Sequence, residues 1–222
     1  MQNNINPGIF ILKFIKLFIG FFVLALGIVI MYKAGIGMTP WGTFHVGLMK
    51  VAGLTLGRIS QIVGLLVILL SMFLKIYPGI ATVLNMFFIG FFIDLINPLN
   101  IYPQPGSKIL QCLMCLAGLW IFSLGIYLYI SCGLGAGPRD GLMVGLIKIT
   151  GFSASYIKPA IEITILISGI ILGGPFGIGT FLIAILGGKF LDIIFNIADY
   201  DPAETEHLSF LQFFKLIRSY IL

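Results

Sequence analysis

The stretch GIGMTPWGTFHVGLMKVAG, residues 35–53, recurs as GLGAGPRDGLMVGLIKITG at residues 133–151. Both copies follow the pattern G-x-G-x-x-P-x6-G-L-x-K-x-x-G, and the offset of 98 residues continues without a gap as far as DLI at 94–96 and DII at 192–194. Membrane helices share Leu and Ile by composition, but matched Gly, Pro, Lys and Asp at one offset rarely arise by chance. The chain therefore contains an internal duplication.

The composition around this repeat is that of an integral membrane protein. Of 222 residues, 59% are hydrophobic and only 9% are charged, and the mean hydropathy is +1.11. Soluble domains carry about 25% charged residues, so a soluble enzyme or a disordered linker is excluded. The formal charge of +5 comes from basic residues scattered among apolar runs, which form no face for nucleic acid.

Six apolar segments are long enough to cross a bilayer, which requires about 20 residues. They predict an all-α membrane protein with about six transmembrane helices, at about residues 10–32, 57–75, 79–97, 108–131, 156–173 and 177–197. The predicted organisation is an N-terminal repeat over 1–98, a polar Pro-rich joint over 99–107, a C-terminal repeat over 108–198, and a tail over 199–222. That tail is acidic at first and then has the spacing of an interfacial amphipathic helix.

Three spans per repeat is an odd number, so the two halves are expected in opposite orientations, as an inverted repeat. With a cytoplasmic N-terminus, eight basic residues fall inside and four outside, which favours N-in and C-in. The segments near 40–52 and 138–150 are short and polar for spans, so we expect each to be a half-helix dipping into the protein. If they crossed the membrane instead, each half would have four spans and the repeat would be parallel.

The repeated motif predicts a broken helix, because a Gly-rich turn ends one helix and Pro suits the first turn of the next. Such breaks expose backbone amides and a positive helix end that can hold an anion. The alternative is that the glycines only let helices pack closely. If the breaks form a site, the expected substrate-binding residues are Gly35, Gly37, Thr39, Pro40, Trp41, Gly133, Gly135, Gly137, Pro138, Arg139 and Asp140.

The G-x-G-x-x-P-[WR]-[GD] stretch, the later G-T-x7-G-x3-D pattern and the duplicated small chain resemble the YczE/YyaS/YitT family of bacterial membrane proteins. The resemblance covers nearly all of the chain outside the first ten and last twenty residues. The first repeat has Pro40-Trp41-Gly42 where such proteins often have Pro-Trp-Asp, whereas the second has Pro138-Arg139-Asp140. The resemblance implies a bacterial inner-membrane protein and supplies neither a substrate nor catalytic residues.

Ionisable groups inside spans are costly and are therefore functional candidates. Glu162 and Lys189 fall at similar depths, which suggests an ion pair facing a cavity, with separate snorkelling to the interface as the alternative. Two further pairs within the repeats are expected to tie each half-helix to a span, for charge coupling or structure: Asp94 with Lys50, and Asp192 with Lys148. His45 and Asn85 are polar and have no equivalents in the repeat.

The sequence thus favours a small secondary transporter or permease in the bacterial plasma membrane. Its partners would be the lipid bilayer and a small polar or anionic substrate, with Arg139 favouring an anionic group. A membrane scaffold or accessory subunit that does not transport is the alternative. No HExxH or GxSxG motif is present, and Cys112-x-x-Cys115 lies in an apolar run, so we expect no enzyme activity, catalytic residue, cofactor or metal.

Overall fold

A computed structural model describes residues 7–99, 102, 105–135 and 137–201 of the chain. Its regular structure over these ranges is entirely helical. The first half contains α1 (Pro7–Ala34), α2 (Pro40–Ala52), α3 (Leu56–Phe73) and α4 (Ile80–Ile96), followed by a 3-10 turn at Asn97–Leu99. The second half contains α5 (Lys108–Ile130), α6 (Pro138–Thr150), α7 (Ala154–Ile171) and α8 (Ile178–Ile197).

Six of these helices are long and apolar enough to cross a membrane, and they coincide with the six predicted spans. The prediction of an all-α membrane protein with six such helices is therefore confirmed. Their outer surfaces carry large apolar side chains such as Phe73 and Ile171, which are 84% and 78% exposed. Exposing these apolar side chains to water would be unfavourable, whereas the hydrocarbon of a bilayer can contact them without that free-energy cost. A bilayer would therefore cover this surface. The two short helices, α2 and α6, occupy the repeated motif.

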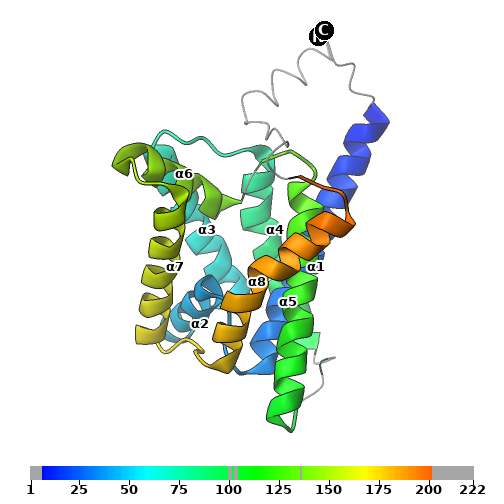
Figure 1. The fold of residues 1–222 in the computed structure, drawn as a ribbon, viewed down its shortest axis with the longest axis vertical. Coiled ribbons are helices and arrows are strands. Elements are labelled where there is room, and N and C mark those ends of the chain that lie inside the picture. The colour runs from blue at the N-terminus through cyan, green and yellow to red at the C-terminus, as the bar shows by residue number, and fades with distance from the viewer. Residues whose placement is uncertain (1–6, 100–101, 103–104, 136, 202–222) are drawn as a thin grey trace.

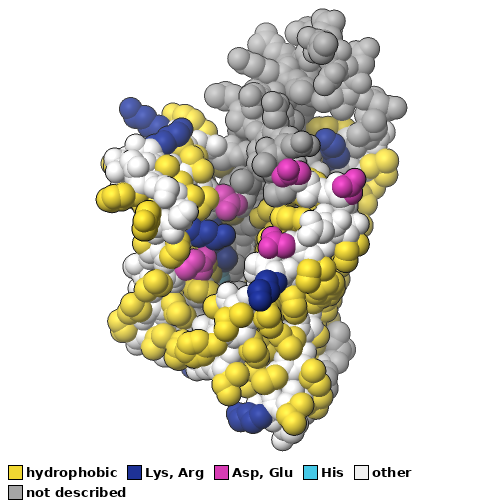
Figure 2. Space-filling view, viewed as in Figure 1, with side chains coloured by type: hydrophobic (Ala, Val, Ile, Leu, Met, Phe, Trp, Pro, Cys, Tyr) yellow, Lys and Arg dark blue, Asp and Glu magenta, His cyan; other side chains and the backbone are white. Residues whose placement is uncertain are grey.

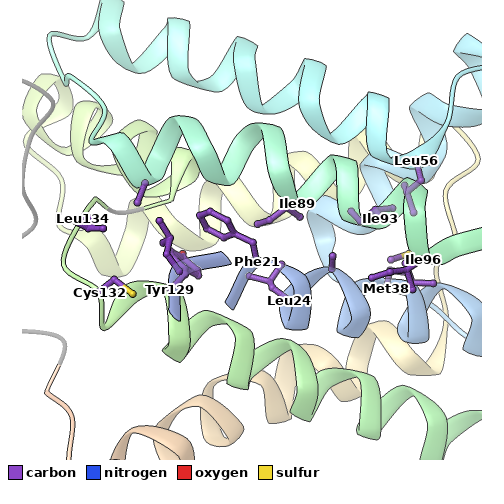
Figure 3. Close-up of a cluster of buried hydrophobic side chains, with 14 of the residues drawn as sticks. Phe21, Leu24, Met38, Leu56, Ile89, Ile93, Ile96, Tyr129, Cys132 and Leu134 are labelled. Carbon is purple, nitrogen blue, oxygen red and sulfur yellow. The ribbon is translucent and has the colours of Figure 1, made fainter. Parts of the chain in front are cut away.

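The helices form two bundles, and each bundle takes members from both halves of the chain. The first bundle contains α1, α4, α5 and α8, with α1 and α5 packed along their length (Figure 1). Gly27 and Gly125 allow this close approach, since a Cβ on Gly27 would lie 2.5 Å from the Phe122 nitrogen and one on Gly125 would lie 2.5 Å from the Leu24 nitrogen. Figure 3 shows part of the apolar core of this bundle, including Phe21 and Tyr129.

The second bundle contains α2, α3, α6 and α7, and the two halves exchange partners in it. Helix α2 packs on α7, where a Cβ on Gly47 would lie 2.8 Å from Leu172 Cβ. Helix α6 packs on α3 in the equivalent way, with a Cβ on Gly145 2.6 Å from Leu74 Cδ1. Neither half is therefore a self-contained unit, although the sequence divides them cleanly at residues 99–107.

The two bundles meet along α3 and α4, whereas α7 and α8 are not packed against one another. Figure 2 shows a hollow between α6 and α7 on one side and α8 on the other, with acidic and basic side chains on its walls. The predicted interfacial helix in the tail lies in residues 202–222, outside the described part of the chain.

Candidate functional site

The two helix breaks have matching backbone geometry. Gly35 and Gly133, which end the first helix of each half, have φ of 71° and 68°. Gly37 and Gly135 follow with φ of 123° and 135°, values that L side chains rarely adopt. Equivalent hydrogen bonds then fix both connections, from Ala81 N to Leu134 O (3.0 Å) and from Gly179 N to Ile36 O (2.8 Å). The repeat in sequence is thus also a repeat in local structure.

Each half-helix begins at its proline with a capped first turn, but the caps differ. Thr39 Oγ1 accepts a hydrogen bond from Gly42 N at 3.0 Å, whereas Gly137 N donates to Asp140 Oδ2 at 2.9 Å. Thr39 and Asp140 were expected to line a substrate site. In the structure both side chains satisfy backbone amides of the first turn, which is the ordinary function of a capping residue.

Trp41 and Arg139, the residues that follow the two prolines, bring the half-helices together. The Arg139 guanidinium carbon lies 4.6 Å from the centroid of the Trp41 ring, within the range of a cation–π interaction. Trp41 is buried while Arg139 is exposed. This contact joins the first turn of α2 to the first turn of α6, so the two helix breaks lie close to each other.

Helix α7 adds an acidic group to this centre. The Glu162 carboxyl accepts a side-chain hydrogen bond from Trp41 and interacts electrostatically with Arg139 and with Lys158. Glu162 is half-buried, and Lys158 is exposed. Positive and negative groups therefore face the same indole ring from two different helices.

His45 lies one turn beyond Trp41 on α2, with the two ring centroids 6.4 Å apart. It is 6% exposed, and its Nε2 is buried without a hydrogen-bond partner among the described residues. The helix lies outside the six spanning segments. Burial, reinforced by the charge of Arg139, lowers the pKa of His45 to about 3, so the ring is neutral. A buried polar nitrogen with no partner is costly and marks a position where a ligand or water would be stabilised.

A cavity of about 180 Å³ lies on another side of α6, between its first turn and the α3–α4 connection. Its polar lining comes from Ser71, Thr82 and Asp140, beside Gly137 and Tyr77. The cavity is large enough for water or a small ion. The start of α6 therefore borders open space in addition to its contact with Trp41.

The predicted pair of Asp94 with Lys50 is not formed in the structure, because both side chains have other partners. Asp94 accepts hydrogen bonds from Gly57 N (2.8 Å) and Thr55 Oγ1 (2.5 Å), while Lys50 Nζ donates to Gly173 O at 2.6 Å. The expected Asp94–Lys50 pair is therefore replaced, because Asp94 bonds to groups at the start of α3 and Lys50 bonds to the α7–α8 connection.

Lys189 is not among the described groups that act on Glu162; Arg139 and Lys158 are. Asp192 and Lys148 are both exposed, and no ion pair joins them in the described part of the chain. They lie on α8 and α6, which belong to different bundles. Both expectations assumed that neighbouring spans of one half pack together, and the exchange of partners between the halves breaks that assumption.

Sequence reasoning left His45 outside the site because it has no equivalent in the second repeat. The equivalent position is Met143, so the repeat gave no signal. His45 could have been identified from its position four residues after Trp41, because this spacing places both side chains on one face of a helix.

Comparison with known proteins supports the resemblance. Residues 11–196 match the family described as "Family of unknown function (DUF6198)". The "Uncharacterized membrane protein YczE" of Bacillus subtilis is 37% identical over 82% of this chain and 84% of its own length. An "Uncharacterized protein" of Haemophilus influenzae is 32% identical over 79% of each chain, and the "Uncharacterized protein YyaS" of B. subtilis is 28% identical over 85% of this chain and 94% of its own. No solved structure matches.

Proposed function

The chain belongs to the DUF6198 family of unknown function, and we propose that this multi-pass membrane protein is a small secondary transporter. The observation that carries the proposal is the meeting of two broken helices at Arg139 and Trp41, 4.6 Å apart. Arg139 is exposed on α6, and α6 forms one wall of the hollow in Figure 2. Paired breaks in repeated halves are typical of substrate sites in transporters. Charged side chains inside a membrane protein are also retained mainly where they serve a function.

The chemistry of the centre supports a small polar or anionic substrate. The planar guanidinium of Arg139 can donate two parallel hydrogen bonds to a carboxylate or phosphate. It stands at the first turn of α6, where the helix dipole also favours negative charge. Glu162 offsets part of this positive charge. The neutral His45 ring offers one further polar atom, Nε2, that has no described partner.

The orientation of the protein is part of the proposal. We place it in the bacterial plasma membrane with both termini in the cytoplasm and with the two halves oriented oppositely. In this arrangement the α3–α4 connection and the end of α6 are cytoplasmic, whereas the α4–α5 and α7–α8 connections are outside. Transport rather than catalysis is the proposed activity.

A non-transporting scaffold is the second candidate, and the packing of the motif glycines favours it. A Cβ at Gly47 or Gly145 would lie under 3 Å from a leucine of the neighbouring helix, so these glycines serve helix packing. Gly27 and Gly125 do the same between α1 and α5. A scaffold, however, has no use for an exposed arginine beside a hollow.

Uptake by purified protein in proteoliposomes, against a panel of radiolabelled organic acids, amino acids and phosphate, tests the transporter. We expect at least one compound to accumulate, and Arg139→Ala and Glu162→Gln to abolish its uptake. Arg58→Ala is the matched control, because Arg58 is an exposed arginine on α3 that is not among the charges acting on Glu162 or His45, and it should transport normally. If no compound enters although the protein is folded, or if Arg139→Ala transports like the parent, the scaffold is the better description.

A further inference from the structure

The two bundles contact each other mainly along one interface, between α3 and α4. We call this interface the first seam. Asp94 on α4 accepts hydrogen bonds from Gly57 N and Thr55 Oγ1 at the start of α3. Gly57 and Gly90 face each other so closely that a Cβ on Gly90 would lie 2.5 Å from Gly57 O. Gln61 Nε2 adds a hydrogen bond to Phe87 O at 2.9 Å. This seam lies at the outer end of α3 and α4 in the proposed orientation.

The second half carries related chemical groups at the same repeat positions, but they are apart. Ser153, Ser155, Gly188 and Asp192 stand where the first half has Thr55, Gly57, Gly90 and Asp94. The Ser153 side chain makes no capping hydrogen bond, a Cβ on Gly188 would meet nothing within 4 Å, and Ser155 and Asp192 are exposed. The hollow of Figure 2 lies where this second seam would be.

Ser155 stands where the first half has Gly57, and this difference changes how closely α7 and α8 could pack in a second seam. A Cβ on Gly57 would lie 2.0 Å from Gly90 O and 2.5 Å from Asp94 Cγ, so α3 and α4 could not pack as they do with a serine at residue 57. Helices α7 and α8 would therefore meet at a wider spacing. The serine also brings a hydroxyl, which extends beyond the backbone amide and can reach a carboxylate across that wider gap.

The arrangement of the bundles allows the second seam to close. The bundle of α1, α4, α5 and α8 touches the bundle of α2, α3, α6 and α7 mainly along α3 and α4. A rotation of one bundle against the other that parts α3 from α4 would therefore bring α7 toward α8. The repeat-related connections that begin at Gly35 and Gly133, each with glycines at positive φ, join the bundles on both sides and can serve as hinges.

We propose that α7 closes on α8 in a second state of the protein, while α3 separates from α4. Asp192 then accepts hydrogen bonds from the hydroxyls of Ser153 and Ser155, as Asp94 does from Thr55 Oγ1 and Gly57 N. This closure shuts the hollow over Arg139 from the cytoplasmic side and opens the outer side. The inference rests on the proposed function for its purpose, since it gives the site alternating access, but its geometry rests on the repeat alone.

Two differences between the seams explain which state the structure adopts. Pro159 occupies the position equivalent to Gln61, so the second seam lacks the side-chain amide that bonds Phe87 O in the first. The first seam has three hydrogen bonds, whereas the second can make two and is held wider by Ser155. The state with α3 on α4 is thus the more stable one without substrate, and a ligand that binds the other state more tightly would shift the balance toward it.

Disulfide trapping tests the closure. In a chain with Cys112, Cys115 and Cys132 changed to Ala, Ser155→Cys and Gly188→Cys should cross-link under mild oxidation in native membranes, because closure would bring their Cα atoms within about 4.4–6.8 Å, as a disulfide requires. Gly187→Cys with Ser155→Cys is the matched control. Gly187 lies one residue away and faces Leu119 on α5, so this pair should stay reduced.

Two repeat-related substitutions should bias the same read-out in opposite directions. Asp94→Asn weakens the first seam and should raise the rate of cross-linking of the 155–188 pair roughly tenfold, because hydrogen bonds to a charged group are the stronger kind. Asp192→Asn should lower that rate by a smaller factor, roughly threefold, because Ser155→Cys leaves only Ser153 to donate a hydroxyl. Chromatographic monodispersity of each variant establishes that it is folded before the rates are compared.

The proposal is overturned if the 155–188 pair does not cross-link in any folded variant, if it cross-links no faster than the 155–187 pair, or if both Asn variants change the rate in the same direction. The read-out needs no substrate, so it separates the two proposals. Cross-linking as expected without any uptake would contradict the transporter and leave the closure standing. Uptake without cross-linking would contradict the closure and leave the transporter standing.

Discussion

At the level of single residues, the site depends on the contact between Arg139 and Trp41. The position directly after the helix-starting proline carries Trp41 in the first repeat and Arg139 in the second. One side chain is aromatic and the other is cationic, so together they form a cation–π pair that two copies of either residue could not form. The Trp41 ring is buried in an apolar cluster with Ile59 of α3 and Leu142 of α6. The exposed Arg139 guanidinium lies over the face of this ring. A lysine at 139 would supply the charge but not the planar donor fork.

Fluorescence can detect this contact directly. The chain has two tryptophans, so Trp120→Phe leaves Trp41 as the single reporter. In that background we expect Arg139→Ala to shift the emission of Trp41 to longer wavelength, because the ring loses its cover and gains water, and to cost about 0.5–1 kcal/mol of stability. Arg58→Ala should leave the emission unchanged. An identical spectrum for Arg139→Ala would show that the guanidinium does not cover the ring.

The repeat-related pair Gly90 and Gly188 gives a second prediction for single residues. A Cβ at Gly90 would lie 2.5 Å from Gln61 Cγ and from Gly57 O, whereas one at Gly188 meets nothing within 4 Å. We expect Gly90→Ala to lower stability by about 1–3 kcal/mol through overpacking. Gly188→Ala should be neutral or stabilising by up to about 1 kcal/mol, since Ala favours helix. Thermal unfolding in detergent compares them, and equal losses would contradict the asymmetry of the two seams.

At the level of the helical elements, the two half-helices differ in burial, because α2 has six buried residues, among them Trp41 and Val46. Helix α6 has only two buried residues, Leu142 and Gly145. Both half-helices end at a glycine in the left-handed conformation, Gly53 and Gly151. Short helices are marginal alone, so capping and tertiary contacts with the exchanged partner helix supply the stability.

The cap of α2 can be tested by a conservative pair of substitutions. Thr39→Ala removes the acceptor for Gly42 N and should cost about 0.5–2 kcal/mol. Thr39→Ser keeps a hydroxyl at the same atom and should recover most of that loss. Unfolding in mixed micelles, followed by circular dichroism, measures both. The cap assignment fails if the serine variant is as unstable as the alanine variant.

At the level of the whole molecule, the exchange of helices between the halves gives two bundles joined mainly at one seam. A protein built this way can move as two bodies, because the tightest contacts lie inside each bundle, such as α1 on α5 and α2 on α7. The proposed orientation places the open side of this arrangement toward the cytoplasm.

Site-directed labelling tests that orientation. In the cysteine-free chain, Tyr77→Cys lies between α3 and α4 and Gly106→Cys between α4 and α5, and both positions are exposed. A maleimide that cannot cross membranes should label Gly106→Cys in intact cells and Tyr77→Cys only after permeabilisation. The opposite pattern would place both termini outside and would reverse the side to which the hollow opens.

Local sequence was sufficient to predict the membrane class, the six spanning helices and the positions of the two breaks. These features follow from composition and from residues with strong backbone preferences, such as Gly37 and Pro40, which act wherever the chain folds. The duplication could also be detected from the sequence, because Gly, Pro, Lys and Asp matched together at one offset of 98 residues rarely arise by chance.

Which charges meet, by contrast, depends on the packing of helices that are distant in the chain. The sequence placed Asp94 beside Lys50 and Glu162 beside Lys189 as neighbours within one half, but α2 packs on α7 and α6 on α3. Some side-chain partners therefore come from the other half, as Gly173 does for Lys50 and Trp41 for Glu162. Others come from an unexpected element of the same half, as Thr55 and Gly57 do for Asp94.

The two seams, one closed at Asp94 and one open at Asp192, show the same dependence. Both have a hydroxyl, a glycine and an aspartate at matched positions. The replacement of Gly57 by Ser155 becomes informative only once the structure shows that this position lies between two helices. The two copies of the pattern pack differently, because the packing of whole bundles sets the distance between the helices. That distance cannot be predicted from the local sequence of either copy.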